Sequence, residues 1–162
     1  MHIAQMNVGT ALYDLDHPGM AGFMDNLDRV NALAEAASGF VWRLKGEGNN
    51  ATDLKVSEDP RFIVNMSVWA NVEALFDYVY RSDHRAVMVR RREWFAKPEG
   101  PYHVLWWVGE EQLPSVEDGL ARLRHLAEHG PTPHAFTFKT VFPENSIGPV
   151  DLKPEPYCVG WA

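Results

Sequence analysis

Side chains able to do chemistry are densest between Tyr80 and Phe95. This stretch holds His84, five arginines and the aromatic pair Trp94–Phe95 within a helix-like pattern. Unpaired charge is costly to bury, so an arginine-rich helix is not expected inside a core. An ordinary surface helix, in turn, has no need for a Trp–Phe pair. The stretch is therefore predicted to lie at a boundary, where it lines either a polar pocket or a partner interface.

His84 and Arg91 are the catalytic candidates. A helix that begins near Ser82 would place His84, Met88 and Arg91 on one face, followed by Trp94. His84 could act as a general base or acid while Arg91 holds an anion. Its place in the first helical turn predicts a neutral imidazole at pH 7. Two alternatives stay open for His84: ligation of haem iron, or a structural bond to a backbone carbonyl at the helix break.

Three consecutive arginines, 90–92, cannot all face the pocket, because successive helical residues are rotated by about 100 degrees. The register favours Arg91 as the inward one. Glu93 is predicted to pair with Arg90 or Lys97.

Two expected strands carry polar stripes. Asn65, Ser67 and Trp69 alternate with apolar residues on one, and Gln5 and Asn7 do so on the other. These stripes predict either a polar-lined cavity or side chains that satisfy one another across a dimer interface. Tryptophans could line a flat aromatic pocket, or they could pack a core or a dimer interface. The candidate ligand-contacting residues are Asn7, Asn65, Ser67, Trp69, Met88, Trp94 and Trp107.

The elements that position these residues follow from periodicity and turn signals. Strands are expected at residues 2–8, 40–44, 62–69 and 102–108, with a loop at 46–59. Helices are expected at 22–37, from 72 to a break at 81–83, from 82 to 95, and after Ser115 as far as Gly130. A short strand is expected at 135–139.

This β-α-β-β-α-β order predicts an α+β, ferredoxin-like fold with a four-stranded antiparallel sheet and an extra C-terminal helix. Helices are expected on one face of the sheet. The other face is apolar and needs a cover, which a homodimer joined by its sheets would supply. One domain is predicted over residues 1–143, followed by an irregular tail at 144–162.

Four motifs carry a resemblance to a known family: Tyr80–His84 (YRSDH), Arg90–Phe95 (RRREWF), Val104–Val108 (VLWWV) and His129–Phe138 (HGPTPHAFTF). Over roughly residues 3–143 the chain resembles the domain of unknown function 3291 family, in the dimeric α+β barrel superfamily of antibiotic-biosynthesis monooxygenase-like proteins. The resemblance implies a dimeric barrel with a ligand pocket. That superfamily includes cofactor-free oxygenases, which use Asn and Trp to hold aromatic substrates, as well as haem enzymes and proteins without known chemistry. A shared fold implies a pocket rather than a reaction.

The function expected is therefore a monooxygenase-like enzyme that acts on a flat, partly anionic small molecule. The alternatives are a non-catalytic binding module or metabolite carrier, and a haem-binding protein. No cofactor is predicted for the enzyme or the carrier. Haem would be the cofactor only if the protein is a haem-binding member of the superfamily. No metal site is predicted, since the i, i+4 pair His125 and His129 is a weak signal.

Composition excludes several classes of protein. A net charge of -7 argues against a nucleic-acid partner. No apolar run is long enough to span a membrane. The single cysteine, Cys158, cannot form a disulfide within the chain, which fits a cytoplasmic protein.

Overall fold

A four-stranded antiparallel sheet forms the centre of the molecule. The computed structural model describes residues 1–144 of the chain. Strands β1 (His2–Thr10), β2 (Phe40–Arg43), β3 (Phe62–Trp69) and β4 (His103–Val108) lie in the order β2-β3-β1-β4. This is the ferredoxin-like topology that the sequence predicts. The 46–59 segment connects β2 to its neighbour β3, as expected for a hairpin loop.

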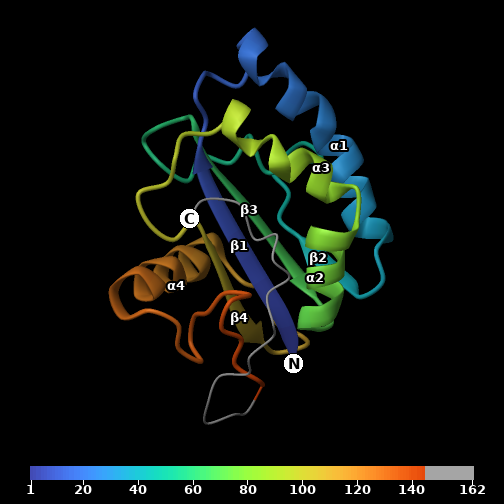
Figure 1. Ribbon diagram of the computed structural model, residues 1–162, viewed down its shortest axis with the longest axis vertical. Coiled ribbons are helices and arrows are strands. Elements are labelled where there is room, and N and C mark those ends of the chain that lie inside the picture. Colours follow the sequence, from blue (N-terminus) through green and yellow to red (C-terminus); the bar gives the residue numbers. More distant parts are fainter. Residues whose placement is uncertain (145–162) are drawn as a thin grey trace.

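Helices lie on both sides of the sheet. Helices α1 (Ala21–Ala36), α2 (Val72–Arg81) and α3 (His84–Val89) gather on one side, and α4 (Val116–His129) lies on the other (Figure 1). Short 3-10 turns occur at Pro18–Met20 and Arg91–Glu93. We call the side with α1, α2 and α3 the first face of the sheet and the side with α4 the second face.

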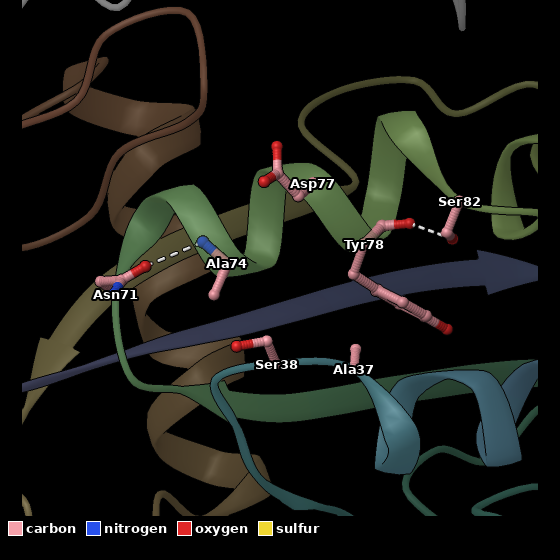
Figure 2. A pocket seen from close by; sticks show the side chains of 7 residues that line it. All are labelled: Ala37, Ser38, Asn71, Ala74, Asp77, Tyr78 and Ser82. Carbon is pink, nitrogen blue, oxygen red and sulfur yellow. Dashed lines mark hydrogen bonds between the residues drawn. The ribbon is translucent and has the colours of Figure 1, made fainter.

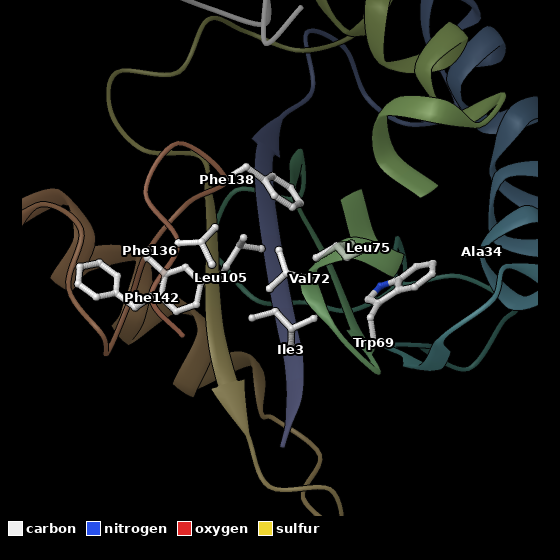
Figure 3. Packing of buried hydrophobic residues seen from close by; sticks show 10 residues of the cluster. Ile3, Ala34, Trp69, Val72, Leu75, Leu105, Phe136, Phe138 and Phe142 are labelled. Carbon is white, nitrogen blue, oxygen red and sulfur yellow. The ribbon is translucent and has the colours of Figure 1, made fainter. Parts of the chain in front are cut away.

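The core on the first face is built from side chains that alternate along the strands. Ile3, Trp69 and Leu105 point toward Leu75 of α2 (Figure 3). The Trp69 ring is fully buried, stacks on Tyr78 at 4.9 Å and meets Phe40 edge to face. The chain after α4 closes this core with Phe136, Phe138 and Phe142. Phe136 exchanges two backbone hydrogen bonds with Leu105 of β4, so the strand predicted at 135–139 is replaced by isolated bridges, of which this one joins the segment to the sheet.

The expectation of helices on one face only is wrong. Helix α4 packs its Leu126 against the second face, where Met6, Met66 and Trp106 are almost fully buried. Gly119 allows this approach, because a Cβ at that position would lie 2.4 Å from Cε of Met6. Ser115 caps the helix by accepting a bond from the Asp118 amide, and Gly130 ends it at φ 71°, as the sequence predicts. An uncovered apolar face therefore no longer argues for a dimer.

The predicted helix break is confirmed, but the second helix is shorter than expected. Helix α2 ends at Arg81 and α3 begins at His84, with Ser82 in extended conformation between them. The Ser82 hydroxyl donates to the Tyr78 carbonyl and accepts from the His84 amide, so it serves both helix ends. Helix α3 stops at Val89 instead of continuing to Phe95, and a 3-10 turn follows. The change of pitch lets Trp94 and Phe95 enter a small core with Met20 and Ala11.

The structure does not test the predicted C-terminal tail. Beyond its first residue the predicted tail at 144–162 lies outside the described residues, as does Cys158. No helix in residues 1–144 has the length and apolar character needed to cross a membrane.

Candidate ligand-binding site

A cavity of about 770 Å³ lies between the first face of the sheet and helices α1, α2 and α3. The polar stripes of β1 and β3 form its floor. Helix α3 contributes His84, Val87 and Met88 to its wall. Ligand pockets of proteins commonly have this size and a largely apolar lining with a few polar groups.

A network of amide side chains orders the floor of the cavity. Gln5 lies directly opposite Ser67, and Asn7 lies opposite Asn65. Gln5 Nε2 donates to Asn65 Oδ1 at 2.9 Å and to Ser67 Oγ at 3.0 Å, and Asn7 Nδ2 donates to Gln5 Oε1 at 3.2 Å. Trp69 Nε1 also donates to Ser67 Oγ, at 2.9 Å. These side chains line the cavity, as one of the two alternatives predicts, and they satisfy one another within one chain instead of across a dimer interface.

The network leaves some polar groups available to a ligand. Within residues 1–144 the N–H groups of Asn65 and the Oδ1 of Asn7 have no protein partner, although both side chains line the cavity. Their orientation is held by the bonds of Gln5 and Ser67, so they present fixed donors and a fixed acceptor at the floor.

Arg91 supplies a positive charge to the cavity wall. Its Nη2 donates to the Val8 carbonyl at 2.8 Å, and its guanidinium lies over the rings of Phe95 at 4.7 Å and Tyr102 at 5.1 Å. Gly9 makes this packing possible, because a Cβ there would lie 2.7 Å from Nη2. Arg90 instead turns outward and pairs with Glu93 at 2.8 Å, so the inward register of Arg91 and one of the two pairings predicted for Glu93 are confirmed.

No acidic side chain of residues 1–144 compensates the charge of Arg91. No Asp or Glu within residues 1–144 pairs with it, and its buried Nε has no hydrogen-bond partner. Burial lowers the pKa of the guanidinium, although an arginine stays charged at any physiological pH. A buried cation without a counter-ion is costly, which makes this position suited to an anionic ligand.

His84 lines the same cavity as a neutral imidazole. Burial lowers its pKa, and this effect outweighs the opposite effect of its contact with the Val79 carbonyl. The lowered pKa of His84 agrees with the neutral imidazole that the sequence predicts, but its cause is burial and not the helix dipole. Nδ1 lies 3.4 Å from the Val79 carbonyl oxygen, which can only accept, so Nδ1 carries the proton and Nε2 is left as the basic atom. His84 therefore contacts a backbone carbonyl and also lines the cavity.

The structure brings most of the predicted ligand-contacting residues together. Asn7, Asn65, Ser67, Met88 and Trp94 all line the cavity. Trp69 lies behind the lining, where it supports Tyr78 and Ser67. Trp107 lies elsewhere, with its Nε1 donating to the Phe142 carbonyl at 2.6 Å. Alternation along a strand places Trp107 on the correct face, but only tertiary structure shows that the chain after α4 covers it.

His103 is a cavity residue that the sequence did not single out as a ligand contact. It lies on β4 opposite Asn7 and stacks on Phe138 with the ring centres 5.7 Å apart. Burial, assisted by the charge of Lys139, lowers its pKa to about 4. Its Nε2 is buried without a hydrogen-bond partner. The signal in the sequence was its alternation with Leu105 and Trp107 on the inward face of β4.

The charge of the cavity lining opposes the charge of the whole protein. Its basic side chains are Arg43, Arg85, Arg91, Arg92, Lys97 and Lys139, whereas Glu99 is its acidic side chain. The chain as a whole carries a net charge of -7. A cleft lined by one sign of charge concentrates ligands of the opposite sign.

A second hollow, of about 420 Å³, lies between the end of α1 and helix α2 (Figure 2). Most of its polar side chains already have local partners. Asn71 accepts from the Ala74 amide, Ser82 donates to the Tyr78 carbonyl, and Asp77 pairs with Arg81. This hollow therefore offers little to a ligand.

The residues give little support to a metal centre. No group of three or more His, Cys, Asp or Glu side chains in residues 1–144 is arranged to hold a metal ion. For haem, His84 Nε2 is the candidate axial ligand and Arg91 the candidate propionate partner, and no further observation favours that group.

The comparisons with known proteins identify a family. The model of the domain of unknown function DUF3291 matches residues 2–150, so the chain belongs to that family, as its motifs predict. No curated protein matches the sequence.

Three solved structures are similar at low identity. SnoaB, a cofactor-independent oxygenase from Streptomyces nogalater, is 18% identical over 70% of this chain and 98% of its own, with a TM-score of 0.49. NE2512, a protein of unknown function from Nitrosomonas europaea, is 19% identical over 70% and 95% of the two chains, with a TM-score of 0.46. The structural-genomics protein YJCS is 14% identical over 67% and 100%, with a TM-score of 0.45.

Proposed function

We propose that the protein binds a flat organic anion in the cavity on the first face and acts on it as a small monooxygenase-like enzyme. The observation that carries the binding proposal is Arg91, a cation held in the cavity wall by aromatic rings and a carbonyl, with no carboxylate partner among residues 1–144. A ligand anion would supply the missing counter-charge and could accept hydrogen bonds from the N–H groups of the guanidinium.

In this proposal His84 is the general base. Its Nε2 would take a proton from an acidic hydroxyl or carbon of the substrate, and Arg91 with the N–H groups of Asn65 would stabilise the negative charge. Arg91 follows His84 by seven positions across α3 and the turn after it, which corresponds to roughly 10–14 Å at a rise of about 1.5–2.0 Å per residue. A molecule that touches both is therefore expected to contain two or more fused or linked rings. An electron-rich anion of this kind is the form that could react with dioxygen.

Two alternatives remain distinct from this proposal. A carrier would bind the same ligand without turnover, and a haem protein would be coloured when purified. A homodimer is a further prediction, which sedimentation at micromolar concentration measures. Helix α4 already covers part of the face through which that dimer was expected to form.

Binding is tested with two dyes that differ only in charge. 1-Anilinonaphthalene-8-sulfonate is a flat aromatic anion, and N-phenyl-1-naphthylamine is the same molecule without the sulfonate. The fluorescence of both rises in apolar surroundings. Arg91→Gln is expected to weaken the sulfonate about tenfold, the size of one charge-assisted hydrogen-bonded contact, and to leave the neutral dye unchanged. Arg124→Gln, on the exposed side of α4, is the matched control. Equal binding of the sulfonate by Arg91→Gln and the original protein would refute the anion site.

Catalysis is tested separately by oxygen consumption with hydroxylated aromatic acids. His84→Gln is expected to abolish consumption while dye binding persists, and His125→Gln on α4 is its control. Binding without any consumption by the original protein would favour the carrier.

A further inference from the structure

His103 and Asn7 face the cavity from adjacent strands, and neither side chain has its polar groups fully used. They are Cα partners in the pairing of β1 with β4. His103 Nε2 is buried without a partner, and Asn7 Oδ1 receives no hydrogen bond within residues 1–144. A buried polar group without a partner is destabilising, so such a group on a cavity wall points to a ligand atom that completes it.

We propose that His103 and Asn7 form a second recognition point of the cavity, which binds an uncharged hydroxyl group of the ligand. This inference rests on the proposed function of the cavity. A hydroxyl matches the two residues because it accepts one bond and donates one. It would accept from His103 Nε2–H and donate to Asn7 Oδ1. Ring stacking between His103 and Phe138 fixes the plane in which the imidazole presents that bond.

The charges around this point exclude other ligand groups. A ligand ammonium could donate to both residues, but Lys139 lies close enough to His103 to disfavour a further cation there. A carboxylate would leave Asn7 Oδ1, which can only accept, facing a second acceptor. A neutral hydroxyl avoids both conflicts.

The position relative to Arg91 defines the class of ligand. The Tyr102 ring lies 5.1 Å from the Arg91 Cζ and 6.0 Å from the His103 ring, so one small aromatic molecule can reach both groups. The ligand inferred is a hydroxylated aromatic acid, with its anion at Arg91 and a neutral hydroxyl at His103.

The test compares 2-naphthoate with 6-hydroxy-2-naphthoate, which share the ring and the carboxylate and differ by one hydroxyl. By calorimetry the original protein is expected to bind the hydroxylated acid about three- to tenfold more tightly, the range of one neutral hydrogen bond. His103→Phe keeps an aromatic ring against Phe138 and is expected to bind the two acids equally. His125→Phe, on α4 outside the cavity lining, is expected to keep the preference.

A second measurement covers the case in which His103→Phe does not fold. The ring nitrogens of His103, observed by nitrogen NMR in the original protein, are expected to shift with the hydroxylated acid and not with 2-naphthoate. Equal affinities and unchanged His103 signals would overturn this inference while leaving the anion site intact. Failure of both acids to bind would instead count against the proposed function itself.

Discussion

Acid is expected to destabilise the protein through His103, and His103→Phe is expected to remove that sensitivity. The pKa of His103 falls from an ordinary 6.5 to about 4 in the folded protein. Above pH 6.5 the imidazole is neutral in both the folded and the unfolded states. Between pH 6.5 and pH 4 the unfolded chain binds a proton that the folded protein does not. The free energy of unfolding therefore decreases as the pH falls through this window, and the effect levels off below about pH 4.

The magnitude follows from the two pKa values. One pKa unit corresponds to about 1.4 kcal/mol, so the full difference corresponds to roughly 3 kcal/mol. The His103 side chain is not fully shielded from solvent, which reduces the effect, and we expect about 1–3 kcal/mol.

Urea unfolding followed by circular dichroism at pH 7.5 and at pH 4 measures this effect. The quantity of interest is the difference in the free energy of unfolding between the original protein and His103→Phe. Other titrating groups, including His84, are present in both proteins and largely cancel. The difference is expected to move by about 1–3 kcal/mol in favour of His103→Phe on acidification. A difference that stays constant between the two pH values would refute the neutral, buried state of His103.

Three further predictions concern stability and follow from single contacts. Gly39→Ala is expected to cost about 1–3 kcal/mol more than Gly130→Ala in urea unfolding. Both glycines have positive φ, but only at Gly39 would the new Cβ meet another atom closely, 2.6 Å from Cβ of Ala74; equal costs would contradict the clash. Arg91→Met is expected to leave the melting temperature unchanged or raised, because it removes a half-buried charge that no Asp or Glu of residues 1–144 neutralises, and a large loss would show that Arg91 is structural. Leu75→Ala is expected to cost about 2–5 kcal/mol, because Leu75 is 1% exposed and belongs to the core that borders the cavity; a cost under about 1 kcal/mol would contradict that packing.

Local sequence patterns were sufficient to predict the sheet and the break between α2 and α3. Alternation placed Gln5, Asn7, Asn65 and Ser67 on one face, because side chains on a strand point alternately to opposite faces. Ser82 and Asp83 marked the break, because such residues favour caps over helix interiors. Strand alternation and helix capping depend on neighbouring residues in the chain, so the sequence alone reveals them.

Long-range packing is what the sequence could not supply. Nothing in the pattern of α4 says which face of the sheet it covers, and that choice depends on Gly119 meeting Met6 from the far side. Trp107 and Trp69 have the alternation of lining residues, yet the segment near Phe142 and the ring of Tyr78 come between them and the cavity. His103 was missed as a ligand contact for the same reason, since its unpartnered Nε2 depends on neighbours distant in sequence.

The central claim is that an aromatic anion binds between Arg91, His84 and the amide floor. The most direct test of this claim is to soak a crystal of the protein with 6-hydroxy-2-naphthoate and to determine the structure. Ligand density is expected between the first face of the sheet and α3, with the carboxylate within hydrogen-bond distance of the Arg91 guanidinium. Density for the ligand elsewhere on the molecule, with the cavity empty and the Arg91 guanidinium still bound only to the Val8 carbonyl, would contradict it.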